Sequence, residues 1–268
     1  MTIIIYLFMF ILGTALGSFV NMLVFRTAVA YKLRKGKFRP KILQNRSGCD
    51  FCGKQLSVWE NIPVVSWLVQ GGESRCCATP LPRQYPLVEL STGILMLFTF
   101  IKLGEVGDAK AVVGGLLMLT WTTLLAFHFW FDLNYMILPD FATAILALLA
   151  LSLGIINGTS LVNSLVGAGV GLLVIGGLWA VTKGQGMGLG DVKLAPVLGW
   201  WLGGQMAVVW LYLAFIIGAG VGVVLLALGV VKRKQPIPFG PFLIVAGIAA
   251  WWGQEWWRIV WSWFIVKI

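Results

Sequence analysis

The chain has 268 residues, of which 59% are hydrophobic and 11% are charged, and its mean hydropathy is +0.90. Soluble domains carry roughly 25% charged residues, so this composition excludes a soluble globular protein. It predicts an all-α protein that crosses a membrane several times. The net charge of +10 is unevenly spread, because eleven of the 20 Lys and Arg residues lie between Arg26 and Arg83.

The apolar runs predict eight transmembrane helices, since a span needs about 20 apolar residues. The first run, residues 3–25, has no basic segment before it and is longer than the apolar core of a signal peptide, so we interpret it as a membrane helix. Gly13 and Gly17 within it form a small-xxx-small pair that favours close helix packing. The other seven helices are predicted at 86–103, 111–131, 138–156, 161–182, 191–203, 206–231 and 239–253.

These helices divide the chain into four segments. Residues 1–25 form the first membrane helix, and residues 26–85 form a basic cytoplasmic domain that contains all the cysteines. Residues 86–253 form a membrane core of seven helices. Residues 254–268 form a tail rich in tryptophan, a residue that prefers the membrane interface.

Basic loops of membrane proteins face the cytoplasm, which sets the orientation of the helices. With both termini outside, the loops at 26–85, 132–137, 183–190 and 232–238 are cytoplasmic and carry most of the basic residues. The basic domain is also suited to anionic lipid headgroups, so we expect membrane lipid as a partner. The sequence contains no recognisable nucleic-acid-binding module, and we expect no nucleic acid.

Only three acidic residues occur between Asp108 and Glu255: Asp132, Asp140 and Asp191. Each lies at the end of an apolar span, on the side predicted to be cytoplasmic. Carboxylates beside hydrocarbon are costly, so they are candidates for function.

Asp132 and Asp191 have the chemistry of an aspartyl catalytic pair. Two carboxylates held together share a proton, so one can deprotonate water while the other polarises a peptide carbonyl. Gly188 and Gly190 precede Asp191, and without a Cβ they allow a substrate backbone to approach and a positive φ to form.

Each acidic residue also has a purely structural interpretation. Asp140 follows Pro139 near a helix start, where the helix dipole favours an acid, and we prefer this role for it. Asp191 could likewise cap its helix. His128 is the single histidine, and we predict that it is packed rather than metal-binding, because one histidine makes a poor metal site.

The four cysteines, Cys49, Cys52, Cys76 and Cys77, all lie in the 26–85 domain. A cytoplasmic location would keep them reduced, which favours a metal site over disulfides.

Together these segments resemble the type IV prepilin peptidases, which are GxGD aspartyl proteases of the bacterial inner membrane. The resemblance extends over nearly the whole chain through short motifs in a shared order. They are Gly17–Asn21, the Cys49-x-x-Cys52 pair, Glu60–Leu68, Tyr85–Leu90, Asp132 with Leu138–Asp140, Gly188–Lys193 and Pro238–Phe242.

The resemblance implies an activity that composition alone does not. Members cleave the basic leader of type IV prepilins or pseudopilins after a glycine at the cytoplasmic face, and cleavage needs no cofactor. Many then methylate the new N-terminus with S-adenosylmethionine. By this resemblance Asp132 and Asp191 are catalytic, and the residues that support the motifs or bind substrate are Gly188, Gly190, Lys193, Asp140 and Glu89.

The chain departs from the family pattern in its cysteines. The usual two C-x-x-C pairs suggest a tetrahedral zinc site. Here Ser74 occupies the position expected for the third cysteine, and Cys76 is adjacent to Cys77. Two alternatives stay open: zinc bound by all four cysteines, or a degenerate site held by packing.

The leader that such proteases remove is basic. We expect Glu60, Glu89 and Asp50 to be candidates for acidic groups that face it.

Other functions compete with this one. The protein could cleave without methylating, because the family's methyl transfer is associated with the altered loop. It could be a presenilin-like protease, which shares the GxGD element. It could also be a proton-coupled transporter with acidic relay residues, although no inverted repeat is visible.

Overall fold

The computed structural model describes residues 2–34, 48–49, 51–104, 108–232, 235–257 and 259. In this part of the chain the regular structure is helical and includes no β-strand, which confirms the predicted all-α class. The chain divides into two compact units, Met1–Trp130 and Phe131–Ile268.

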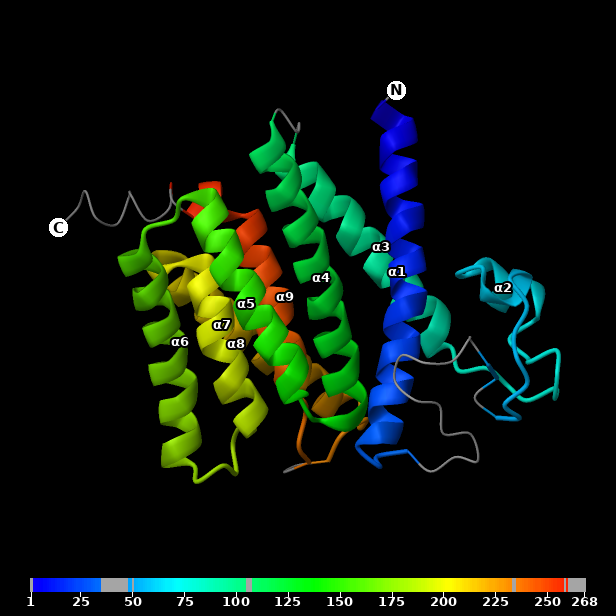
Figure 1. The fold of residues 1–268 in the computed structure, drawn as a ribbon. Coiled ribbons are helices and arrows are strands. Elements are labelled where there is room, and N and C mark those ends of the chain that lie inside the picture. Colours follow the sequence, from blue (N-terminus) through cyan, green and yellow to red (C-terminus); the bar gives the residue numbers. More distant parts are fainter. Residues whose placement is uncertain are drawn as a thin grey trace. The chain divides into compact units, whose positions relative to one another are not determined.

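The helices follow the predicted order (Figure 1). The first unit contains α1 (Thr2–Ala30), the 3-10 turn η1 (Trp59–Asn61), the short α2 (Val65–Val69), α3 (Gln84–Leu103) and most of α4 (Ala109–Tyr135). The second unit contains the end of α4, then α5 (Asp140–Asn157), α6 (Leu161–Val181), α7 (Leu189–Leu202), α8 (Gly204–Ala227) and α9 (Gly240–Trp252).

Six of the described helices, α1, α3, α4, α5, α6 and α8, are long and apolar enough to cross a membrane. The prediction of a multi-pass membrane protein is therefore confirmed. Helices α7 and α9 have 14 and 13 residues. At about 1.5 Å per residue they extend roughly 20 Å, less than the roughly 30 Å of the hydrocarbon core. All eight predicted segments are helical, but the count of eight spans stays a prediction.

The end of α4 differs from its predicted position. Hydropathy placed the helix end at Phe131, whereas the helix continues to Tyr135, so Asp132 lies inside the last turn. The prediction was wrong because a carboxylate ends an apolar run without ending the backbone hydrogen bonding. The amide of Met136 still donates to the carbonyl of Asp132 at 2.8 Å.

Helices α1 and α3 form a tight pair in the first unit (Figure 1). A Cβ at Gly13 would lie 2.6 Å from the Cβ of Met96, and a Cβ at Gly17 would lie 2.6 Å from the Cα of Glu89. Gly93 of α3 leaves similar space for Thr14. The predicted small-xxx-small pair is thus confirmed as the contact face between these two helices.

In the second unit, α7 is the central helix and contacts α5, α6, α8 and α9. Its closest neighbour is α6, where Gly167 and Gly199 meet backbone to backbone. A Cβ at Gly171 would lie 2.6 Å from the carbonyl oxygen of Ala195. These glycines fix α7, and therefore the acidic residue in its first turn, within the bundle.

Several predicted features lie outside the described residues. They are the basic run at 35–46, Asp50, the basic residues 233–234 and most of the tryptophan-rich tail, including Trp261 and Trp263.

The glycine contact between α1 and α3 predicts an asymmetric response to alanine. Gly17→Ala should destabilise the protein by about 1–3 kcal/mol, because the added methyl overlaps the α3 backbone. Gly177→Ala in α6 is the matched control, since its Cβ would meet nothing within 4 Å and alanine is the better helix former. Thermal unfolding in detergent measures both. A Gly17→Ala protein as stable as the control would contradict this packing.

Candidate active site and cysteine cluster

The second unit brings Asp132 and Asp191 to one point beside Gly240. Asp132 comes from the last turn of α4, Asp191 from the first turn of α7, and Gly240 begins α9. A Cβ at Gly240 would lie 2.6 Å from Asp132 Oδ2 and 3.5 Å from Asp191 Oδ1. The two predicted catalytic carboxylates are therefore neighbours, although 58 residues of sequence lie between them.

Backbone amides at two helix starts hold these carboxylates. The amide of Gly240 donates to Asp132, and the amide of Gly188 donates to Asp191 Oδ2 at 3.2 Å. Helix N-termini carry partial positive charge, which stabilises nearby anions. Asp132 lies at the unfavourable C-terminal end of its own helix, so the N-terminus of α9 offsets that cost. Capping of its own helix therefore does not explain why an acidic residue stands at position 132.

One oxygen of each carboxylate remains without a hydrogen-bond partner among the described residues. These atoms are Asp132 Oδ2 and Asp191 Oδ1, and both are buried. They are also the two oxygen atoms among the three atoms nearest to the Cβ position of Gly240. Unpaired buried oxygens are costly and rare, and such atoms are expected to be satisfied by a shared proton, water or a substrate group.

The two glycines before Asp191 have different roles. A Cβ at Gly190 would lie 2.9 Å from the Cβ of Leu138, so this glycine allows α7 to pack against the segment between α4 and α5. Gly188 has more space, and its nearest neighbour would be Asp191 Oδ2 at 3.4 Å. Neither glycine adopts a positive φ. The positive φ that glycine would allow at these positions does not occur, because the motif forms an ordinary start of α7.

Asp140 lies outside the carboxylate pair. It occupies the first turn of α5 and forms a 2.7 Å ion pair with Lys193, which is two residues after Asp191. The side chains are 70% and 51% exposed, respectively, so the pair contributes at most about 1 kcal/mol. This agrees with the helix-start role preferred for Asp140, and it gives Lys193 a partner.

In the first unit, Glu89 and His128 are both buried. His128 is fully buried and its Nδ1 lies 2.9 Å from the carbonyl oxygen of Leu124, as expected for a packed histidine. Glu89 accepts the amide of Val64 at 2.6 Å, and only 7% of it is exposed. Glu60 instead accepts the amide and hydroxyl of Ser57, each at 2.8 Å, at an exposed position.

The four cysteines of the first unit come together as unbridged thiols. Their sulfurs all lie within 4.8 Å of one another. Individual pairs are separated by 3.7 Å for Cys49–Cys77, 3.2 Å for Cys52–Cys76 and 3.9 Å for Cys76–Cys77. A zinc ion with bonds of about 2.3 Å places tetrahedral sulfurs about 3.8 Å apart. The cluster therefore has dimensions that fit zinc, and adjacent cysteines do not prevent this.

The cysteines lie on two turns of the same shape. In the first turn, Cys49 donates its amide to Lys54 and accepts from Gly53; in the second, Ser74 donates to Thr79 and accepts from Ala78. A bridge flanks each turn, Gly48 with Gln55 and Glu73 with Pro80. Ser74 thus occupies the place equivalent to Cys49, and Cys77 the place equivalent to Cys52. Cys76 supplies the fourth sulfur from a position without equivalent.

Hydrogen bonds to these thiols give them unequal acidity. The Thr79 hydroxyl is the main cause that lowers the pKa of Cys77 to about 6. The Ser74 hydroxyl lowers the pKa of Cys76, but the neighbouring thiols of Cys52, Cys49 and Cys77 raise it to about 12 overall. Four thiolates at these distances repel one another, and a bound dication is what would allow all four to be deprotonated.

Sequence reasoning missed Gly240 and Leu138 as members of the carboxylate site. Both lie in the motifs Pro238–Phe242 and Leu138–Asp140 that carry the resemblance. Both residues act through close packing against other parts of the chain, and an uncharged residue does not reveal such a contact in sequence.

Comparison with known proteins agrees with this geometry. Residues 11–103 match the bacterial peptidase A24 N-terminal domain, and residues 116–223 match the type IV leader peptidase family. Proteins named prepilin leader peptidase/N-methyltransferase are similar over most of their length. That of Aeromonas hydrophila is 35% identical, covering 92% of this chain and 90% of the relative. That of Pseudomonas aeruginosa is 37% identical, covering 91% and 89%.

No solved structure matches the chain significantly. The second family match spans Asp132 and Asp191, and the first spans the four cysteines and Glu89. With relatives above 30% identity over nine-tenths of its length, the chain belongs to the type IV leader peptidase family.

Proposed function

We propose that the protein is a membrane aspartyl endopeptidase that removes the leader of type IV prepilins or pseudopilins and then methylates the new N-terminus. The printed name of the relatives, prepilin leader peptidase/N-methyltransferase, supports both steps. The observation that carries the cleavage step is the convergence of the two unpartnered oxygens, Asp132 Oδ2 and Asp191 Oδ1, beside Gly240.

The carboxylate pair acts through one shared proton. The ionised aspartate removes a proton from water, whose oxygen attacks the carbonyl carbon of the leader glycine. The protonated aspartate donates to the carbonyl oxygen and stabilises the tetrahedral intermediate. Collapse of the intermediate breaks the C–N bond, and a proton passes to the leaving amine. The amides of Gly188 and Gly240 orient the carboxylates throughout.

The residues around the pair have supporting roles in this proposal. Gly190 and Leu138 set the position of the α7 start, and therefore that of Asp191. The Lys193–Asp140 ion pair joins α7 to the start of α5 at the exposed edge of the site. That exposed edge is suited to polar parts of a substrate.

The charge distribution supports a location in the bacterial inner membrane, with the site at the cytoplasmic face. The basic residues between Arg26 and Arg83 favour a cytoplasmic domain. Asp132 at the end of α4 and Asp191 at the start of α7 then lie on the cytoplasmic side by helix count. In this proposal the substrates are prepilin or pseudopilin precursors made in the cytoplasm, and membrane lipid surrounds the protein.

Zinc is proposed as a structural ion of the cysteine cluster. Four thiolates without an open ligand position form the closed kind of site that stabilises a fold rather than catalyses a reaction. The cluster lies in the segment that joins α1 to α3, and Cys49 also lines a cavity there. Loss of zinc would therefore disturb this segment, with which the family's methyl transfer is associated, while the aspartate pair needs no metal.

Replacing either aspartate should remove nearly all cleavage. Asp132→Asn and Asp191→Asn remove the shared-proton chemistry, and cleavage of a prepilin-type precursor should fall by roughly 10²–10⁴-fold. Asp108→Asn is the matched control, because Asp108 accepts the amide of Ala111 at the start of α4 and asparagine caps helices equally well. Peptide products are followed by mass spectrometry. Substantial cleavage by either variant would remove that residue from the mechanism.

Gly240 should be nearly as sensitive although it has no side chain. In Gly240→Ala the new methyl would overlap Asp132 Oδ2 and displace that carboxylate, lowering the cleavage rate about 10²-fold. Gly220→Ala in α8, whose Cβ would meet nothing within 4 Å, should cleave normally. Equal rates for both variants would show that Gly240 does not shape the pair.

The equivalence of the two cysteine turns predicts a rescue. The purified protein should contain about one zinc per chain, and Cys76→Ala should lower this content because one of four ligands is lost. Adding Ser74→Cys should restore zinc, since residue 74 holds the place equivalent to Cys49. Zinc is measured by elemental analysis, and cleavage should continue in both variants. A preparation without any zinc would contradict the metal proposal.

A further inference from the structure

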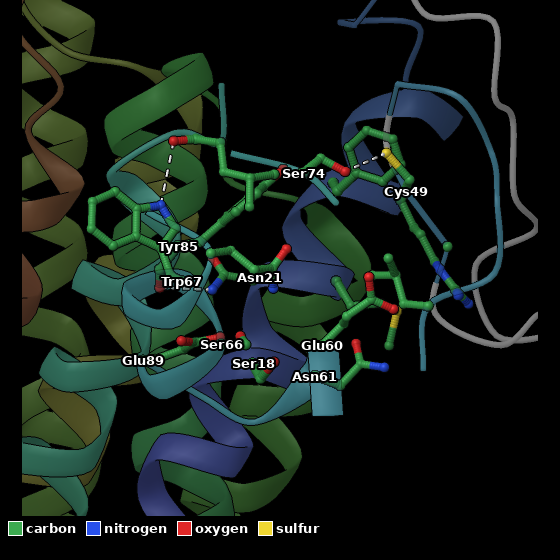
Figure 2. Close-up of a pocket in the computed structure, with 17 residues that line it drawn as sticks. Ser18, Asn21, Cys49, Glu60, Asn61, Ser66, Trp67, Ser74, Tyr85 and Glu89 are labelled. Carbon is green, nitrogen blue, oxygen red and sulfur yellow. Dashed lines mark hydrogen bonds between the residues drawn. The ribbon is translucent and has the colours of Figure 1, made fainter. Parts of the chain in front are cut away.

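The four cysteines of the first unit differ in how far they are buried. In the two equivalent turns, Cys49 and Ser74 hold the inner places, and each is only 4% exposed. Their side chains point toward each other, with Cys49 Sγ 3.5 Å from the Ser74 hydroxyl, and both line a cavity of about 150 Å³ (Figure 2). Cys52 and Cys77 hold the outer places and are exposed. The inner side of each turn is therefore buried, and the outer side faces solvent.

Serine at position 74, where the family pattern has a cysteine, moves one sulfur outward. A cysteine at position 74 would share the burial of Cys49, because the two turns have the same backbone hydrogen bonds. The fourth sulfur instead belongs to Cys76, which is partly exposed. Three of the four cysteines therefore reach solvent, and only Cys49 is buried. Oxidation of thiols follows their exposure and thiolate character, so this arrangement opens the cluster to oxidants.

Two of the outer sulfurs already lie close together. Cys52 Sγ and Cys76 Sγ are 3.2 Å apart, the shortest of the three sulfur–sulfur distances given above. A disulfide bond is about 2.05 Å long, so these sulfurs need to approach by roughly 1.2 Å. Cys52 belongs to the first turn and Cys76 to the second. A bond between them would join the same two turns that a zinc ion joins.

Other pairings of the cysteines are less favourable. Cys76 and Cys77 are adjacent, and consecutive Cα atoms lie about 3.8 Å apart, less than the roughly 4.4–6.8 Å that disulfides usually span. Cys49 is buried and its sulfur contacts the Ser74 hydroxyl, so an oxidant reaches it last. Cys77 is exposed, but its sulfur contacts the Thr79 hydroxyl of its own turn at 3.2 Å.

We propose that Cys52 and Cys76 form a reversible disulfide when the protein meets a peroxide, and that this oxidation releases the proposed zinc. The disulfide does not depend on the peptidase activity, and only the release of metal depends on the zinc site. A disulfide removes two of the four sulfur ligands, and a structural zinc site needs four. Cytoplasmic thiols are reduced at rest, and disulfides that form there are usually transient. The cluster is thus a metal site that responds to oxidants.

The oxidation consumes one peroxide for each disulfide. One thiolate of the pair attacks a peroxide oxygen, the O–O bond breaks, and a sulfenic acid and a hydroxide ion form. The second thiolate attacks the sulfenic sulfur, the S–S bond forms, and a second hydroxide ion leaves. Two protons from solvent convert both hydroxide ions to water. The two sulfurs lose two electrons in total, and the peroxide oxygens gain them.

Peroxide treatment of the zinc-loaded full chain in lipid nanodiscs tests the pairing without any substrate. Hydrogen peroxide should release about one zinc per chain, measured with a chromogenic chelator. After free thiols are alkylated, mass spectrometry should find the Cys52–Cys76 disulfide and alkylated Cys49. Dithiothreitol followed by zinc should restore both thiols and the metal. A disulfide that joins other cysteines, or zinc release without any disulfide, would overturn the proposal.

A double variant changes the place of one sulfur without changing the number of sulfurs. Ser74→Cys with Cys76→Ala returns one sulfur to the buried inner place, so peroxide should release its zinc about tenfold more slowly than that of the wild type. Glu73→Gln, a change at an exposed neighbour without sulfur, should release zinc at the wild-type rate. Equal rates for the double variant and the wild type would contradict the role of Cys76.

The two proposals about the cysteines can fail separately. A purified chain that holds no zinc would contradict the metal site, and the disulfide would still be mapped in the metal-free protein. Zinc that stays bound while peroxide oxidises no cysteine would contradict the disulfide and leave the metal site intact.

Discussion

The fold of the second unit depends on keeping two carboxylates buried among apolar helices. Each carboxylate loses hydration when it is buried, and the protein offsets that loss with backbone amides at helix starts. Gly188 precedes α7 and Gly240 begins α9, and each directs an amide to one aspartate. Amides without a partner inside the helix occur at helix starts, which explains why the site is built from helix ends rather than helix centres.

The same constraint decides what sequence could predict. Asp132 and Asp191 were identifiable because acids are scarce in this chain and costly beside hydrocarbon, and all eight predicted segments are helical. Gly240 was not identifiable, because its contribution is the absence of a side chain at a contact distant in sequence. The end of α4 was misplaced for a related reason: hydropathy detects where charge begins, whereas the helix ends where hydrogen bonding ends.

In the segment that carries the cysteines, one expected metal ligand is replaced by Ser74 while the backbone turn around it is retained. Ser74 preserves the backbone hydrogen bonds of its turn, and its hydroxyl contacts the sulfurs of Cys76 and Cys49 at 3.1 and 3.5 Å. A serine is a poor zinc ligand beside thiolates, but it stabilises their charge as a hydrogen-bond donor. The fourth sulfur then comes from Cys76, two residues later. Spacing in sequence left a four-cysteine zinc site and a degenerate site both open, and the fold brings all four sulfurs within 4.8 Å of one another.

The two units use buried carboxylates in opposite ways. Asp132 and Asp191 lie together, so repulsion favours a shared proton, and the pair has both an acid and a base available for hydrolysis. Glu89 has no second carboxylate beside it, and neutral groups hold it: the amide of Val64 and the side chains of Ser18 and Asn21. Pairing makes a carboxylate a proton-transfer group, whereas Glu89 joins α3 to α1 and to the turn before α2. Burial alone therefore does not determine chemistry; the neighbours of the carboxylate do.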